Sequence, residues 1–259
     1  MFPEVLVADW SARAAPAPAR PSRDALWWYA TWIGEPRYCR THGEAEAQIL
    51  EALEQARGPV LAGFDFCFAL PAWAMHRVGG WRALWRFLRE CAASEVESFA
   101  RELNRRLGGG DSGPFWGFRD APRKPQPWLW TGFRTSELRL KERGLHPKSV
   151  FQLRGAGAVG AQSLVGIGTL ERLRKALEAR VWPFEQTRGA RVVFAEVWPT
   201  LLGRPPAGET IPDRWQVQQL GEALVGIRLP SVPEIARVEG WVLEPVREAA
   251  QPGDPLHWP

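Results

Sequence analysis

Two short apolar segments that each end on an aspartate constrain this chain most. Residues 5–8 (VLVA) are followed by Asp9, and residues 60–64 (VLAGF) are followed by Asp65. Short apolar runs bounded by loop signals are typical of strands buried on both faces of a sheet. A carboxylate at the end of such a strand is costly unless it is paired, hydrogen-bonded or bound to a cation. If the two strands are neighbours, Asp9 and Asp65 lie side by side.

The chain from residue 4 to residue 66 predicts three strands, a helix and a fourth strand. Residues 26–33 (LWWYATWI) and 37–41 (RYCRT) are rich in aromatic and β-branched residues, and a Gly-Glu-Pro turn separates them. The segment EAEAQILEALEQA places apolar side chains at helical spacing. With strands at residues 4–9 and 60–66, we expect an α/β fold in which a three-stranded meander is followed by a helix and further parallel strands in a mixed sheet.

The rest of the chain predicts further elements around this sheet. Helical patterns cover 72–107, 169–180 and 213–226, and a third apolar strand covers 191–199. Residues 108–148 are rich in Gly, Pro, Trp and Arg with little periodicity, which predicts a long loop. We interpret residues 1–259 as a single domain, flanked by helices, with an insertion of helices and loop at about 72–148.

Four acids stand where structural acids are uncommon: Asp9, Asp65 and Glu196 on apolar strands, and Asp213 at the start of a helix. Ligand sites of open α/β sheets form at the carboxyl ends of the strands. Two adjacent carboxylates repel each other unless a cation neutralises them. Mg²⁺ or Mn²⁺ would serve, and two such ions about 3.5–4 Å apart can hydrolyse a phosphodiester. As alternatives, Asp9 caps the following loop and Asp213, after a proline, is the N-cap of its helix.

Several stretches in the expected order give the chain a family resemblance. They are VADWSA, GFDFCFALP, GFRTSE, KSVFQLRGAGAVGAQSLVGI, AEVWPT, DRWQVQ and EGWVL. The chain thereby resembles the bacterial DUF429 family, whose members are described as predicted nucleases of the ribonuclease H-like fold. The resemblance implies that Asp9, Asp65, Glu196 and Asp213 are catalytic carboxylates, with Asp9, Asp65 and Asp213 as metal ligands.

Two details of this carboxylate set remain open in the sequence. Ribonuclease H-type enzymes often place another acid on the helix before the fourth strand, where this chain offers Glu44, Glu46 and Glu51. No pattern selects one of them. Glu196 precedes Val-Trp-Pro, and a slip of one residue along the strand would turn its side chain to the opposite face of the sheet.

Residues 155–160 carry the pattern G-x-G-x-x-G. A dinucleotide site would need a strand before it, a helix after it and an acid about 20 residues further on. The following AQSLVGIG does not look like a long helix, so we favour a glycine turn that either faces a phosphate or packs against the sheet. Within the resembling stretches, Arg134, Arg154 and Gln162 are candidate substrate contacts. Ser11 could hydrogen-bond a phosphate or Asp9.

Charge and aromatic content favour a nucleic-acid partner without requiring one. The net charge is +4, and residues 115–148 carry eight Arg and Lys against three acids, interleaved with Trp116, Phe118, Trp128, Trp130 and Phe133. Such segments bind single-stranded or flexed nucleic acid, or they are solvated loops whose rings cover the sheet.

Other features exclude some classes of protein. The three cysteines form no C-x-x-C pair, the N-terminus lacks a signal-peptide pattern, and no stretch is long and apolar enough for a bilayer span. We therefore expect a cytoplasmic protein that does not enter a membrane. Two alternatives to a nuclease remain. One is a Mg-nucleotide phosphotransferase or ATPase of the actin-like relatives of the fold, although SARAAPAPAR makes a poor phosphate loop. The other is a non-catalytic nucleic-acid-binding module.

Overall fold

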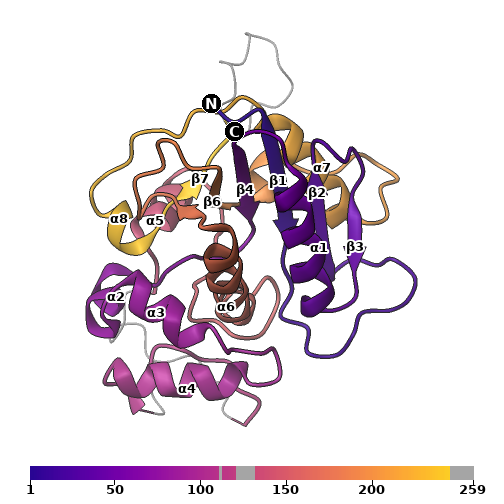
Figure 1. The fold of residues 1–259 in the computed structure, drawn as a ribbon. Coiled ribbons are helices and arrows are strands. Elements are labelled where there is room, and N and C mark those ends of the chain that lie inside the picture. The colour runs from indigo at the N-terminus through magenta and orange to yellow at the C-terminus, as the bar shows by residue number, and fades with distance from the viewer. Residues whose placement is uncertain (111–112, 121–131, 246–259) are drawn as a thin grey trace.

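The computed structural model describes residues 1–110, 113–120 and 132–245, and its centre is a mixed sheet (Figure 1). The strands run in the order β3-β2-β1-β4-β6-β5, and β7 also pairs with β6. The first three strands are antiparallel, and β4 to β7 run parallel to β1. Their bounds are β1 Glu4–Asp9, β2 Leu26–Ala30, β3 Arg37–Cys39, β4 Val60–Phe64, β5 Arg180–Val181, β6 Val192–Val197 and β7 Val242–Leu243. The predicted meander, helix and parallel strands of an α/β fold are confirmed.

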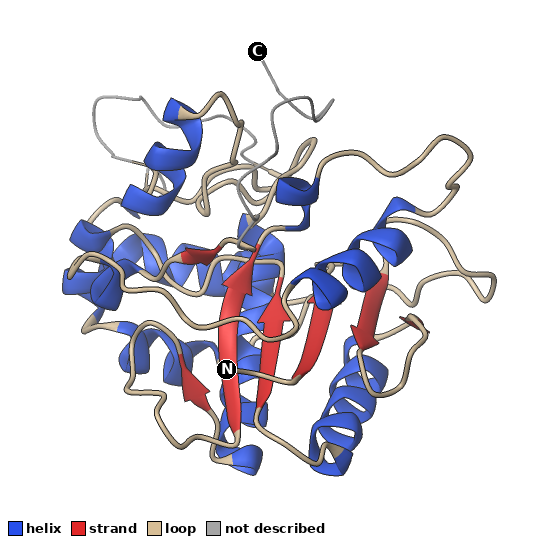
Figure 2. Ribbon diagram, turned by 90° about the horizontal axis from the view of Figure 1, so that it is seen from above, coloured by secondary structure: helices blue, strands red, loops and turns tan. Residues whose placement is uncertain are grey.

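Helices cover both faces of this sheet, as the view from above shows (Figure 2). On one face, α1 and α6 pack beside each other, and α3 and α4 pack on α6. On the other face, α7 packs against β1 and β2. The helices are α1 His42–Gln55, α2 Ala72–Val78, α3 Trp81–Leu88, α4 Val96–Arg106, α5 Thr135–Glu142, α6 Gly160–Leu177, α7 Pro212–Ala223 and α8 Ala236–Glu239, with a short 3-10 helix at Pro199–Leu202.

The central strands are apolar on both sides because each side faces its own core. Along β1, Leu6 and Ala8 belong to the core under α1 and α6, whereas Val5 and Val7 belong to the core under α7. Side chains of a strand alternate between its two faces, so two cores require an unbroken apolar run. This requirement explains the unbroken apolar runs at residues 5–8 and 60–64.

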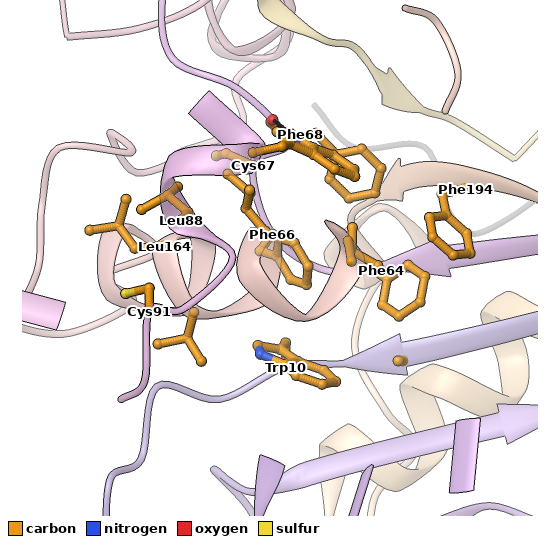
Figure 3. Close-up of a cluster of buried hydrophobic side chains, with 14 of the residues drawn as sticks. Trp10, Phe64, Phe66, Cys67, Phe68, Leu88, Cys91, Leu164 and Phe194 are labelled. Atoms are coloured by element: carbon orange, nitrogen blue, oxygen red, sulfur yellow. Dashed lines mark hydrogen bonds between the residues drawn. The ribbon is translucent and has the colours of Figure 1, made fainter. Parts of the chain in front are cut away.

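The chain that leaves β4 keeps the same alternation and so directs Asp65 away from the larger core. Phe64, Phe66 and Phe68 all enter that core, where neighbouring rings have centroids 6.0 and 5.6 Å apart. Figure 3 shows these rings gathered with Trp10, the residue after Asp9, which is the last residue of β1. Asp65 lies between two of the buried rings in sequence, and its backbone position is therefore fixed by core packing.

Two predictions about the middle of the chain were wrong. Helix α6 begins at Gly160 rather than at residue 169, so a long helix does follow the glycine-rich stretch. Its glycines permit close packing: a Cβ at Gly166 would lie 2.4 Å from Cζ of Phe66, and one at Gly168 would lie 2.4 Å from the carbonyl oxygen of Leu88. The predicted loop at 108–148 contains helix α5, and its residues 111–112 and 121–131 lie outside the described residues.

None of the helices in the described part of the chain has the length and apolar character needed to cross a membrane.

Candidate functional site

Asp9 and Asp65 lie next to each other at the carboxyl ends of β1 and β4. The parallel register pairs Ala8 with Phe64, and the amide N–H of Asp65 donates to the carbonyl oxygen of Ala8 at 3.0 Å. The Gln162 side chain on α6 donates to the carbonyl oxygen of Asp65 at 2.8 Å. Both aspartates are half-buried and line a cleft of about 410 Å³. The sequence prediction that these two acids are neighbours is confirmed.

The protein environment disfavours the charged form of both acids. Burial, followed by the charges of Glu196 and Asp213, raises the pKa of Asp65 to about 7. Burial and the charges of Asp65, Asp213 and Asp24 raise the pKa of Asp9 well above its usual value. Within the described ranges neither carboxylate accepts a hydrogen bond or forms an ion pair. Two unpartnered carboxylates held together repel each other, and a bound cation would remove that repulsion.

Asp213 lies close to this pair but is held by a contact of its own. It is in the first turn of α7, and its Oδ2 accepts from the amide N–H of Asp24 at 2.7 Å. It lines a second cleft of about 380 Å³, to which Asp9 and Ser11 also contribute. The residue at the N-cap of α7 is Ile211, so the alternative that Asp213 is the N-cap was wrong. Burial raises the pKa of Asp213 as well.

Glu196 and Arg134 form a buried ion pair in the wall of the cleft that contains Asp9 and Asp65. Nη1 of Arg134 lies 2.7 Å from Oε2 of Glu196, and Nη2 lies 2.5 Å from Oε1. Arg134 also donates to Glu137 through Nε and Nη2, at 3.0 and 2.8 Å. The side chain of Arg134 is fully buried. Both residues line the cleft of Asp9 and Asp65, but the guanidinium and the carboxylate are bound to each other there, which favours a positioning role for the pair.

Sequence reasoning missed Glu239, which ties three elements to this ion pair. Its carboxylate accepts from the amide N–H of Ala72 at 3.0 Å and from that of Thr135 at 2.5 Å. Its carbonyl oxygen accepts from Nη1 of Arg134 at 3.2 Å. Glu239 therefore holds the N-termini of α2 and α5 beside the cleft, where a negative charge is favourable. The available signal was the stretch EGWVL, which begins with this glutamate.

Of the remaining predicted substrate contacts, two line the clefts beside Asp9 and one does not. Gln162 lines both clefts and lies where they meet. Ser11 lines the second cleft, and its Oγ accepts from the amide N–H of Arg13 at 3.2 Å. Arg154 is held by Glu97, with Nη2 2.6 Å from Oε1, and lines neither cleft.

The three candidate acids on α1 have other partners. Glu44 accepts from the amide N–H of Arg40, Glu46 forms an ion pair with Arg172 at 2.6 Å, and Glu51 accepts from Gln55. None of the three lines a cleft that contains Asp9. The structure therefore selects no glutamate from this helix for the site.

Part of the basic and aromatic segment is used for packing. Phe118 is buried, and Trp116 packs against the core under α6. Phe133 lies beneath Lys141, whose Nζ is 3.2 Å from the ring centroid. Trp128 and Trp130 lie outside the described residues. For Phe118 and Trp116, we therefore favour packing against the protein core over stacking on nucleic-acid bases.

The acid pair fits a hard cation that retains water. Across residues 1–110, 113–120 and 132–245, no group of three His, Cys, Asp or Glu side chains is placed to hold a metal ion, so Asp213 does not complete a three-acid site as the side chains stand. Mg²⁺ commonly binds through only one or two carboxylates and keeps several waters. Asp9 and Asp65 provide such a donor pair, with no competing partner in the described structure.

The comparisons with known proteins add no relative, because no protein-family model, no curated protein and no solved structure matches this chain.

Proposed function

We propose that this protein is a divalent-metal-dependent phosphodiester hydrolase acting on nucleic acid, with a ribonuclease H-like fold as in the DUF429 family. One observation carries the proposal: Asp9 and Asp65 are adjacent and half-buried at the carboxyl ends of two parallel strands, they face a cleft, and neither has a side-chain partner in the described part of the chain. The strand order β3-β2-β1-β4, with α1 before β4, agrees with this fold.

Contacts among the resembling stretches support the proposal further. Ser163 of α6 accepts from the amide N–H of Cys67 at 3.1 Å, and Glu196 of β6 accepts from that of Phe68 at 3.1 Å. Arg134 before α5 is bound to Glu196, and its Nη1 reaches the carbonyl of Glu239. Stretches scattered along the sequence thus meet around the chain that leaves β4 past Asp65. Such convergence is expected of a site that must be held rigidly.

In this proposal each residue has a limited task. Asp9 and Asp65 would hold Mg²⁺ or Mn²⁺, which supplies an activated water and stabilises the leaving oxygen of the phosphodiester. Gln162 fixes the backbone of Asp65 through its carbonyl oxygen. The charge of Asp213 raises the pKa of both acids, and the same negative charge adds to the attraction of a divalent cation to the pair.

A cleavage assay tests the proposal. Purified protein is incubated with labelled DNA and RNA, in single-stranded, double-stranded and branched forms, with Mg²⁺ or Mn²⁺. Wild type should cut at least one substrate, and Asp9→Asn and Asp65→Asn should each cut at least a hundredfold more slowly. Asp120→Asn changes an exposed aspartate elsewhere and serves as the matched control. Cleavage by Asp9→Asn at the wild-type rate would contradict the proposal.

One observation favours the second candidate, a Mg-nucleotide phosphotransferase or ATPase. The glycine-rich loop precedes an 18-residue helix, and its Gly157 and Ala158 line the cleft beside Asp65. Backbone N–H groups at such a helix start bind phosphate. Stabilisation of the protein by ATP with Mg²⁺, measured as a rise in Tm and absent in Asp65→Asn, would favour this candidate. Metal-independent binding of nucleic acid that Asp65→Asn leaves unchanged would instead indicate a binding module.

A further inference from the structure

The two clefts beside the acid pair are neighbours that share lining residues, and together we call them the groove. Asp9, Ala158 and Gln162 line both of them. Asp65 belongs to the first cleft and Asp213 to the second. The acid pair therefore lies partway along the groove, with space on each side of it.

Each half of the groove carries an exposed cation with no acidic partner among the described residues. Lys148 lines the first cleft and Arg13 lines the second, and both side chains are exposed. Neither forms an ion pair with any acid in the part of the chain that the structure describes, whereas Arg134, also in the first cleft, is fully bound by glutamates. The stem of Lys148 lies over Gly157, where a Cβ would be 3.5 Å from its Cε.

Size and lining indicate what such a groove can accept. Each half, at about 410 and 380 Å³, has the volume of a small-ligand pocket, which suits the nucleotides of one strand better than a base-paired duplex. Trp198 lines the first half and is only half-buried. Cations that follow the backbone, together with a ring for stacking, are characteristic of proteins that bind single strands.

We infer that the substrate is a single-stranded nucleic acid that passes across Asp9 and Asp65 and is cut at an internal phosphodiester, with Lys148 and Arg13 binding phosphates on either side. This inference rests on the proposed function and adds its substrate class. A strand held on both sides of the cut needs no free end.

Binding is measured with a fluorescein-labelled twelve-residue thymidine oligonucleotide, in an Asp65→Asn background that prevents cleavage. Lys148→Ala and Arg13→Ala should each weaken binding severalfold. Each should reduce the slope of log K against log salt by about 0.7, and both together by about 1.4. Arg57→Ala, which removes an exposed cation far from the groove, should change neither quantity. A double variant with the same slope as Arg57→Ala, or a parent protein that does not bind the oligonucleotide, overturns the inference.

Cleavage of a circular single-stranded DNA tests the internal cut. Wild type should linearise the circle. In the separate binding assay, Trp198→Ala should bind the thymidine oligonucleotide about tenfold more weakly than its parent, because one stacking contact is lost. Cleavage of linear but not circular strands, or of duplexes only, overturns this inference and leaves the proposed hydrolase intact. No cleavage of any nucleic acid means that the proposed function itself has failed.

Discussion

Arg134 and Glu196 are joined by two buried contacts, 2.7 Å between Nη1 and Oε2 and 2.5 Å between Nη2 and Oε1. The same guanidinium binds Glu137, so one cation serves two buried carboxylates. Oε2 of Glu196 also accepts from the amide N–H of Phe68, three residues beyond Asp65. The ion pair is therefore part of the support that fixes the chain carrying Asp65.

Arg134→Met should unfold the protein more easily, by about 3–5 kcal/mol, because two carboxylates would remain buried without their cation. Arg134→Lys should recover part of this loss, since an ammonium restores the charge but not the two-point geometry. Urea denaturation followed by circular dichroism measures both. Arg139→Met, at an exposed arginine of the adjoining helix α5, is the control and should change the free energy of unfolding by less than about 0.5 kcal/mol. Equal midpoints for Arg134→Met and Arg139→Met would show that the ion pair does not stabilise the fold.

Asp65 should make the metal-free protein less stable as pH rises. Its pKa is about 7 in the folded protein against 3.8 in the unfolded chain, so between these values the folded state binds the proton more tightly. The free energy of unfolding then falls from about pH 4 to about pH 7, by an amount on the order of a few kcal/mol. Asp65→Asn should remove this loss and be more stable than wild type at pH 8 but not at pH 4. Urea midpoints in EDTA at the two pH values check this. If the midpoints of Asp65→Asn and wild type differ by the same amount at pH 4 and at pH 8, the prediction is refuted.

Mn²⁺ should raise the Tm of wild type at pH 8, because a cation that binds only the folded state stabilises it by about 2.7 kcal/mol at a hundred times its Kd. The rise should be smaller at pH 5, where protons compete for carboxylates with raised pKa values. Asp9→Asn should abolish it. Scanning calorimetry with and without EDTA gives the measurement. An equal rise in wild type and in Asp9→Asn would place the ion elsewhere.

The sequence alone predicted the strands and the acid pair correctly where the local residue pattern and the long-range packing agree. Strand β1 and strand β4 are apolar on both faces because two cores enclose them, and that pattern also placed Asp9 and Asp65 together. It was insufficient for Glu196, whose direction depends on a guanidinium 62 residues away. Glu239 was missed for the same reason, since the two amides that it accepts from belong to distant helices.

The glycines of helix α6 also depend on contacts with residues distant in sequence, which the local pattern does not reveal. Gly166 reads as a helix breaker in isolation, yet a Cβ there would meet the ring of Phe66 at 2.4 to 2.7 Å. Gly166→Ala should therefore destabilise the protein by about 1–3 kcal/mol through overpacking, despite the better helix propensity of alanine. Gly43→Ala is the matched control: Gly43 is an exposed glycine of α1 with no atom within 4 Å of the added Cβ, and the substitution should be neutral or stabilising by up to about 1 kcal/mol. Opposite signs of the two changes in urea midpoint are expected, and stabilisation by both would mean that α6 does not pack this closely on Phe66.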